Sequence, residues 1–406
     1  MSQSTVAVGR QSLSKIISGT LMIAGSAIGA GMLGIPLLTA EAGFWPSLVI
    51  TGIVWLFMLC TGLLFLEVTL WMPGGSNILS MSQRFLGKKG KVIAGFMFIF
   101  LYYSLMVAYF AAGAPLVSGF INATFGLNLS GILSYALFGV IFGGIVAIGA
   151  KAIERVSVFL TIAMVVDYFI MVGMGCSDVD MGNFQISEWS AVAFSLPVLF
   201  SAFGYHNIIP SLCDHMSRER KTLKLSIILG TSVPFLIYVA WQWLVIGAIP
   251  QAAVLAAREA GQPATQALQS ISGGSSIFLV GQYFAFFAIV TSMLGVAFSL
   301  VDFIGDGLKV KREGPSRHFL VFLTFFPPFL CVVFDPTLFD RALGVAGGFG
   351  EAFLNGLLPV MLVWMGRYAM KLPSDDALPG GKWTLGLLLL VSLFVICLEL
   401  FLIFSH

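Results

Sequence analysis

The stretch GTLMIAGSAIGAGMLGIP, residues 19–36, lies in the first long apolar segment of the chain. Gly25, Gly29 and Gly31 occupy its centre, and Gly34 and Pro36 follow. Glycine inside a helix costs about 1 kcal/mol relative to alanine, and proline costs more. So many glycines exceed what close helix packing requires. The stretch therefore predicts a membrane-spanning helix that is broken in its middle.

A second stretch of the same kind is LPVLFSAFGYHNIIPSL, residues 196–212. Gly204 lies near its centre, and Pro197 and Pro210 flank it. The letters SAIG at 26–29 and SAFG at 201–204 also correspond. An unwound helix exposes amide N–H groups that bind a carboxylate and carbonyl oxygens that coordinate a cation. Two interrupted segments at matching places in two halves are therefore typical of a transporter site.

The composition excludes a soluble domain. Hydrophobic residues make up 58% of the 406 residues, charged residues only 10%, and the mean hydropathy is +0.97. Soluble domains carry about 25% charged residues. The apolar runs are continuous and not alternating, which favours membrane-spanning helices over a barrel. Membrane lipids are thus the expected solvent, and a net charge of +2 does not suggest a nucleic-acid partner.

Eleven apolar segments are long enough to cross a bilayer, which takes about 20 helical residues. They lie at residues 16–39, 46–71, 92–121, 129–150, 155–175, 190–212, 223–249, 275–305, 318–335, 342–366 and 383–404. The polar residues 1–15 before them predict a cytosolic tail, because no small-residue cleavage site follows a short apolar core. The fold class is therefore an all-α polytopic membrane protein.

The basic residues predict the orientation of these spans. If the N-terminus is cytosolic, all of the 21 lysines and arginines except Arg258 and Arg341 fall in cytosolic segments. Basic loops stay in the cytosol during insertion. With an odd number of spans, the C-terminus at His406 is then external.

Several ionisable side chains lie in or near the apolar segments. A carboxylate at the bilayer centre costs about 2.5–3.5 kcal/mol on insertion scales, so each is a functional candidate. Glu67 and Asp302 have either a coupling role or a role in tying helices together. His206, directly after the second break, has either a substrate or proton contact or a structural hydrogen bond. Asp167 has no partner that the sequence identifies.

Neutral polar side chains add two further candidates. Thr291 and Ser292 offer hydroxyl oxygens either to a small cation or to a neighbouring helix. Tyr103 and Tyr109 in the third segment offer aromatic, hydroxyl-bearing surface for a substrate, or ordinary packing.

Five motifs make the chain familiar. They are GSAIGAGML at 25–33, LLFLEV at 63–68, FSAFGYHNIIPS at 200–211, SMLGVAFSLVDF at 292–303 and FFPPF at 325–329. With them the chain resembles, over nearly its whole length, the bacterial tyrosine-specific transport proteins. These belong to the hydroxy and aromatic amino acid permeases of the amino acid–polyamine–organocation superfamily.

The resemblance implies an inverted five-plus-five helix repeat, with halves at 16–175 and 190–366 and an eleventh helix at 383–404. It implies a site between the first, third, sixth and eighth segments. Since the first break is similar to that of the bacterial leucine transporter, Gly29 and Gly31 would receive the substrate carboxylate. Residues implied at the substrate are Ser26, Ala27, Gly29, Ala30, Gly31, Tyr103, Tyr109, Phe200, Ser201, Ala202, Phe203 and His206. Those implied at a coupling cation are Gly25, Ile28, Ala288, Thr291 and Ser292, with Glu67 and Asp302 as further candidates.

The resemblance also implies a secondary active symporter that imports tyrosine across the bacterial inner membrane, with no cofactor besides the coupling ion. Proton-coupled relatives often carry a lysine in the fifth segment, where Thr161 stands here. Carbonyl and hydroxyl oxygens at Thr291 and Ser292 suit Na⁺, so the residues favour Na⁺ where the family implies H⁺. A tryptophan or broader aromatic permease is the alternative. The oligomeric state is not readable from the sequence.

Channels and membrane enzymes are less favoured. The sequence has no repeated filter and no ring of charge of the kind found in channels. It also has no zinc-binding H-E-x-x-H, no G-x-S-x-G elbow and no phosphate loop. The residues therefore predict transport and not catalysis.

Overall fold

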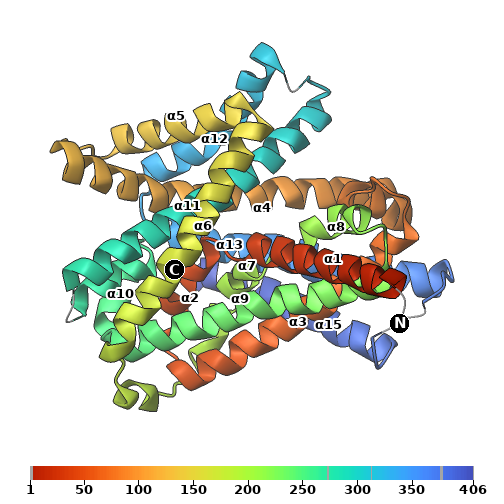
Figure 1. Cartoon of the computed structure of the whole chain (residues 1–406), viewed down its shortest axis with the longest axis horizontal. Coiled ribbons are helices and arrows are strands. Elements are labelled where there is room, and N and C mark those ends of the chain that lie inside the picture. Colours follow the sequence, from red (N-terminus) through yellow and green to blue (C-terminus); the bar gives the residue numbers. More distant parts are fainter. Residues whose placement is uncertain (1–2, 272–273, 312, 375–377, 406) are drawn as a thin grey trace.

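The computed structural model describes residues 3–271, 274–311, 313–374 and 378–405, and every regular element within these ranges is a helix (Figure 1). The first half holds α1 (Gln3–Ala27), α2 (Gly31–Thr39), α3 (Phe44–Trp71), α4 (Ile78–Phe125), α5 (Ile132–Ile148) and α6 (Ala150–Gly175). Short 3₁₀ turns η1 (Cys176–Asp178), η2 (Met181–Gln185) and η3 (Val192–Ser195) lead into the second half.

The second half begins with the sixth span and ends with the tenth. Its elements are α7 (Leu196–Ala202), η4 (His206–Ile208), α8 (Ile209–His215), α9 (Arg220–Ala248), α10 (Gln251–Glu259), η5 (Ala264–Ser270), α11 (Gly274–Leu308) and α12 (Gly314–Phe334). The tenth span joins α13 (Phe339–Val345), the π-helix η6 (Ala346–Leu357), α14 (Leu358–Trp364) and the π-helical turn η7 (Met365–Ala369). The last helix is α15 (Lys382–Ser405).

These helices account for the predicted spans. Within the described ranges nine helices are long and apolar enough to cross a membrane, and the bent pair α1–α2 makes a tenth. The apolar helix α5, with 17 residues, coincides with the predicted fourth segment. Two bounds differ from the prediction by more than ten residues: α1 already begins at Gln3, and α4 begins at Ile78 with a kink at Gly87, where φ is 72°. Hydropathy predicts which residues lie in lipid. A helix can continue into polar residues beyond the lipid, and hydropathy does not predict that part.

The two halves interleave. Figure 1 shows α1 beside α9 and α3 along the other side of α9, and these pairs are in contact. Likewise α6 and α4 pack on α11, and α5 packs on α12. The most apolar window of the tenth span is 72% buried, whereas those of α6 and α15 are only 22% buried. The tenth span is therefore central, and α6 and α15 present apolar side chains to lipid.

Candidate functional site

The first break separates α1 from α2 at residues 28–30, and the two helix axes differ by 58°. The second separates α7 from η4 at residues 203–205. The two breaks meet, because α2 packs on α7. A Cβ at Gly31 would lie 2.8 Å from the Cα of Ala202, so only glycine permits this approach.

Tyr238 of α9 links the last turns of the two half-helices. Its buried hydroxyl lies 2.7 Å from the carbonyl oxygen of Ala27 and 2.8 Å from that of Ala202, the last residues of α1 and α7. Terminal carbonyls of a helix lack partners within it. The hydroxyl has one proton, which the two carbonyl oxygens share, so Tyr238 links the two breaks.

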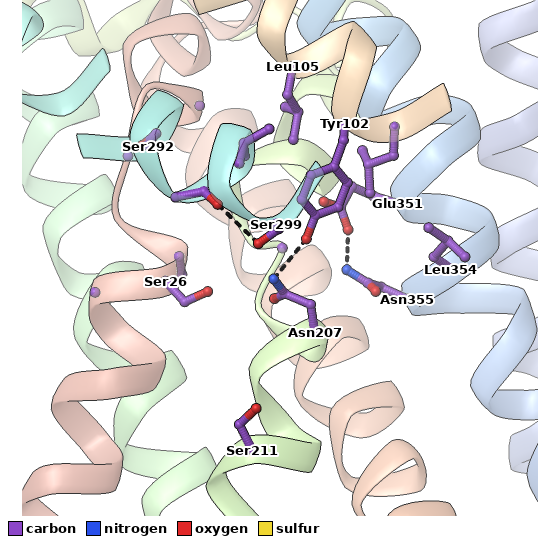
Figure 2. Close-up of a pocket in the computed structure, with 18 of the residues that line it drawn as sticks. Ser26, Tyr102, Leu105, Asn207, Ser211, Ser292, Ser299, Glu351, Leu354 and Asn355 are labelled. Carbon is purple, nitrogen blue, oxygen red and sulfur yellow. Dashed lines mark hydrogen bonds between the residues drawn. The ribbon is translucent and has the colours of Figure 1, made fainter. Parts of the chain in front are cut away.

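A cavity of about 610 Å³ lies against both breaks. It extends from Gly25–Gly31 past Ser201 and Gly204 to Asp214 near the end of α8, and to residues 75–78 between α3 and α4. Figure 2 shows side chains from several elements pointing into it, among them Ser26, Tyr102, Asn207 and Glu351. Phe65, Phe98 and Leu105 add apolar surface. A cavity with apolar walls and a few convergent polar groups is typical of a small-molecule site.

Many of the predicted site residues line this cavity. They are Gly25, Ser26, Ala27, Ile28, Gly29, Ala30, Gly31, Tyr109, Ser201, Thr291 and Ser292. Thr161 also lines it. The first break and the eighth span thus line the same cavity.

The hydroxyls predicted for a cation have partners within the protein. Ser292 Oγ accepts a hydrogen bond from the backbone N–H of Ala30 at 3.3 Å, which joins α11 to the first break. A Cβ at Gly29 would overlap the same oxygen atom. Thr291 donates to the carbonyl oxygen of Phe287 at 2.8 Å.

Five predicted substrate residues are placed away from the cavity wall, of which His206 is described below. Phe200 packs on Phe57 with ring centroids 5.0 Å apart, and Phe203 packs on Tyr238, also at 5.0 Å. Ala202 lies against Gly31. Tyr103 donates to the carbonyl oxygen of Leu323 on α12 at 2.8 Å. A helix presents only one face to a cavity, and on α7 that face carries Ser201.

The predicted coupling residues Ala288, Glu67 and Asp302 are also absent from the wall. Ala288 is fully buried. Glu67 forms a bidentate ion pair with Arg367, with Nε–Oε1 at 2.9 Å and Nη2–Oε2 at 2.5 Å. Both side chains are only 6–7% exposed. Of the two predicted roles for Glu67, the geometry supports the tie between helices, because its charge is already balanced.

His206 is buried and does not line the cavity. Its Nε2 lies 3.0 Å from the hydroxyl of Thr61 on α3, and its ring lies 4.6 Å from that of Tyr205. The contact with a substrate hydroxyl stays a prediction, and the position of His206 outside the cavity lining does not favour it. The short turn η4 directs the imidazole towards α3.

We expect His206→Ala to weaken tyrosine and phenylalanine transport to the same extent. The substitution removes a hydrogen bond to Thr61 worth about 1 kcal/mol and leaves the cavity lining unchanged. Competition assays with the two amino acids on the purified variant measure the ratio. A loss of transport confined to tyrosine would instead support a contact between His206 and the phenol of the substrate.

Four polar residues that converge on the second break were, among other lining residues, not identified as candidates from the sequence. They are Tyr102, Asn207, Glu351 and Asn355. Asn207 donates to the Tyr102 hydroxyl at 3.0 Å, and Asn355 donates to Glu351 Oε2 (Figure 2). The rule that a carboxylate inside an apolar segment is a candidate applies to Glu351 as well. The signal was therefore available within the segment 342–366.

Charge is unevenly placed around the cavity. Among the described residues, its lining includes the carboxylates of Glu351 and Asp214 but no lysine or arginine. Asp214 lies near the end of α8 and pairs with Arg218 at 2.8 Å. Glu351 is 5% exposed and lies beside the second break, where a Cβ at Gly204 would overlap its carboxylate.

A cluster of ion pairs lies beside α10. Arg258 reaches Glu41 after α2 and Asp340 in α13, each at 3.5 Å. Arg258 thus joins α10, the helix that follows α9, to the first and tenth spans. Arg258 is one of the two basic residues that the charge distribution assigns to the external side.

Comparison with known proteins agrees with this geometry. Among curated proteins, a tyrosine-specific transport system 1 of Haemophilus influenzae is 31% identical over 392 residues, covering 94% of this chain and 96% of that protein. A tryptophan-specific transport protein of the same species is 28% identical over 400 residues, covering 95% of each. These relatives are named as transport proteins and not as enzymes.

The fold also matches a solved structure, that of MhsT in complex with L-phenylalanine. The TM-score is 0.63 at 14% identity, over 94% of this chain and 97% of that one. This match confirms the expected fold, an inverted five-plus-five repeat with an eleventh helix. The model of the tryptophan/tyrosine permease family matches residues 12–399, which confirms the resemblance drawn from the motifs. The chain belongs to the tryptophan/tyrosine permease family.

Proposed function

We propose that this protein is a secondary active symporter that imports tyrosine across the bacterial inner membrane, driven by a cation gradient. The observation that carries the proposal is that the two broken helices meet on one cavity. Such breaks supply both N–H groups and carbonyl oxygens at membrane depth. A zwitterionic amino acid needs both.

The cavity wall suggests how the substrate is held. Helix α2 begins at Gly31, so the positive end of its dipole lies beside the first break and suits the substrate carboxylate. Ser201 at the end of α7 adds a polar contact for the amino group. Phe65, Phe98 and Leu105 offer apolar surface to an aromatic ring.

The shape of the cavity supports alternating access with the protein open to the cytosol. Residues 75–78 and Asp214 lie in segments that the basic residues assign to the cytosol, and the cavity reaches them. On the opposite side, Arg258 joins Glu41 and Asp340. The N-terminus is then cytosolic and the C-terminus external.

A tryptophan or broad aromatic permease is the second candidate. It is favoured by the similar identities to a tyrosine-specific and a tryptophan-specific relative, 31% and 28%. A cavity of about 610 Å³ is within the range of small-molecule sites, roughly 300–1,000 Å³. Its volume therefore does not select one aromatic amino acid over another.

Two cations are candidates for the driving ion. Sodium would use the carbonyl oxygens of Gly25, Ile28 and Ala288 and the hydroxyls of Thr291 and Ser292, at the low end of hard-cation coordination. A proton needs a titratable group on the cavity, and Glu351 supplies one. Each ion makes a different prediction for transport under an imposed gradient.

We expect purified protein in liposomes that contain unlabelled tyrosine to take up labelled tyrosine by exchange, without any ion gradient. Exchange requires only that the cavity opens alternately to both sides. Competition by tryptophan and phenylalanine then ranks the substrates. Absence of exchange for all three amino acids, in protein that is folded and inserted, would contradict the proposed function.

A further inference from the structure

We infer that Glu351 takes up and releases the coupling proton of this transporter. The inference rests on the proposed function and assigns its ion-coupling step to one residue. Glu351 lies in the middle of the tenth span, far from either end of the segment Phe339–Ala369. Residues with this chemistry at membrane depth are rare and mark proton or ion pathways.

The place of Glu351 links its charge to the second break. Its carboxylate lies directly against Gly204, where any Cβ would overlap it. Protonation therefore removes a negative charge at the position where α7 ends and the chain unwinds. A change of charge at a broken helix can shift the equilibrium between the outward-open and inward-open states of a transporter.

The environment of the carboxylate suits a proton better than a larger cation. Glu351 is only 5% exposed, Asn355 already donates to Oε2, and Gly204 lies against the carboxylate. A hard metal cation takes about six or more oxygen ligands, and a substrate ammonium brings three N–H donors. The contacts of this carboxylate with Asn355 and Gly204 do not form such a ligand set, whereas a proton needs only one carboxylate oxygen.

Asn355 can satisfy both protonation states. Its amide NH₂ donates to the ionised carboxylate, and after rotation of the amide its carbonyl oxygen accepts from the carboxylic acid. The pair lies in the π-helix η6, which runs for 12 residues. Such helices are rare and are frequently found at functional sites.

The other candidate proton carriers are less suited by position. His206, Glu67, Asp167 and Asp302 do not line the cavity. The titratable side chains of neighbouring helices that face the Glu351 carboxyl are Tyr102 and Tyr109 of α4. Other ionisable groups on elements packed against η6 are placed elsewhere; among them are Glu399 against Gly344 and Gly348, Glu67 with Arg367, Asp340 and Arg341 in α13, Arg84, Lys88, Lys89 and Lys91 at the start of α4, and Lys382 at the start of α15.

The decisive experiment compares wild type, Glu351→Gln and Glu399→Gln in liposomes without sodium. Glu399 is the matched control, a buried carboxylate of α15 that does not line the cavity. With an acidic exterior, we expect wild type and Glu399→Gln to accumulate labelled tyrosine. Glu351→Gln mimics the protonated form. In liposomes with this variant, the concentration of labelled tyrosine inside should therefore only equal that outside, while tyrosine exchange continues.

Four results would overturn the inference. The first is accumulation of tyrosine by Glu351→Gln under the pH gradient, and the second is loss of exchange in this variant together with a weaker affinity for tyrosine. The third is an equal loss of coupling in Glu399→Gln. The fourth is accumulation of tyrosine by wild type under a sodium gradient alone. The second would make Glu351 a partner of the substrate ammonium. Failure of exchange in the wild type would instead contradict the proposed function itself.

Asn355→Leu provides a second test if Glu351→Gln does not fold. Hydrogen bonds to an ionised acceptor are the stronger ones, so the carboxylate loses more than the acid when Asn355 is removed. Release of the proton then needs a more alkaline solution. We expect the pH dependence of tyrosine uptake to shift to higher pH, and an unchanged pH dependence would contradict the assignment.

Discussion

Gly31→Val is expected to abolish tyrosine uptake while the protein still inserts into the membrane. A Cβ at this position lies 2.8 Å from the Cα of Ala202 and 3.2 Å from its backbone nitrogen. These are backbone atoms, so no side-chain rotation relieves the overlap. Overpacking of this kind costs about 1–3 kcal/mol, roughly 5- to 150-fold in an equilibrium, and valine adds two further methyl groups.

The controls for this variant separate the contact between the breaks from a general effect of a larger residue. Gly173→Val on α6 adds the same atoms where a Cβ meets nothing within 4 Å, and it should transport normally. Gly31→Ala combined with Ala202→Gly should not recover uptake, because the overlap with the Ala202 backbone remains. Uptake in liposomes with equal amounts of each protein is the measurement. Near-normal tyrosine affinity in folded Gly31→Val would contradict the assigned site.

The spans and the first break could be predicted because each depends on local sequence. Continuous apolar runs specify helices in lipid, and the glycines between 25 and 31 loosen one of them. The direction of side chains around α7 could not be predicted in the same way. Phe200 and Ser201 are neighbours in sequence, yet only Ser201 lines the cavity, because the rotation of a short half-helix is set by its tertiary neighbours.

Contacts between residues that are far apart in the sequence could not be predicted either. Tyr238 bridges Ala27 and Ala202, which lie 211 and 36 positions away, and no local pattern indicates either contact. Glu351 is a different case, because a lone carboxylate in an apolar segment is visible in the sequence. Its neighbours in AGGFGEAFLNGL, residues 346–357, are mostly small or apolar.

The ion pair between Glu67 and Arg367 leads to the second large effect. The two residues are 300 positions apart and tie the end of α3 to the turn η7 of the tenth span. Removing one partner of a buried pair leaves an uncompensated charge and costs about 3–5 kcal/mol. We therefore expect Glu67→Gln and Arg367→Gln each to lower the thermal stability of the purified protein strongly.

A double substitution distinguishes this tie from the coupling role that the sequence left open for Glu67. Replacing both residues, as Glu67→Leu with Arg367→Met, removes both charges, and such exchanges are often neutral or stabilising. We expect the double variant to recover most of the stability and to accumulate tyrosine under the same gradient as wild type. If it is stable but only exchanges tyrosine, Glu67 carries the coupling ion, and the assignment of that step to Glu351 fails with it. A tie between helices tolerates the loss of both charges, whereas an ion carrier does not.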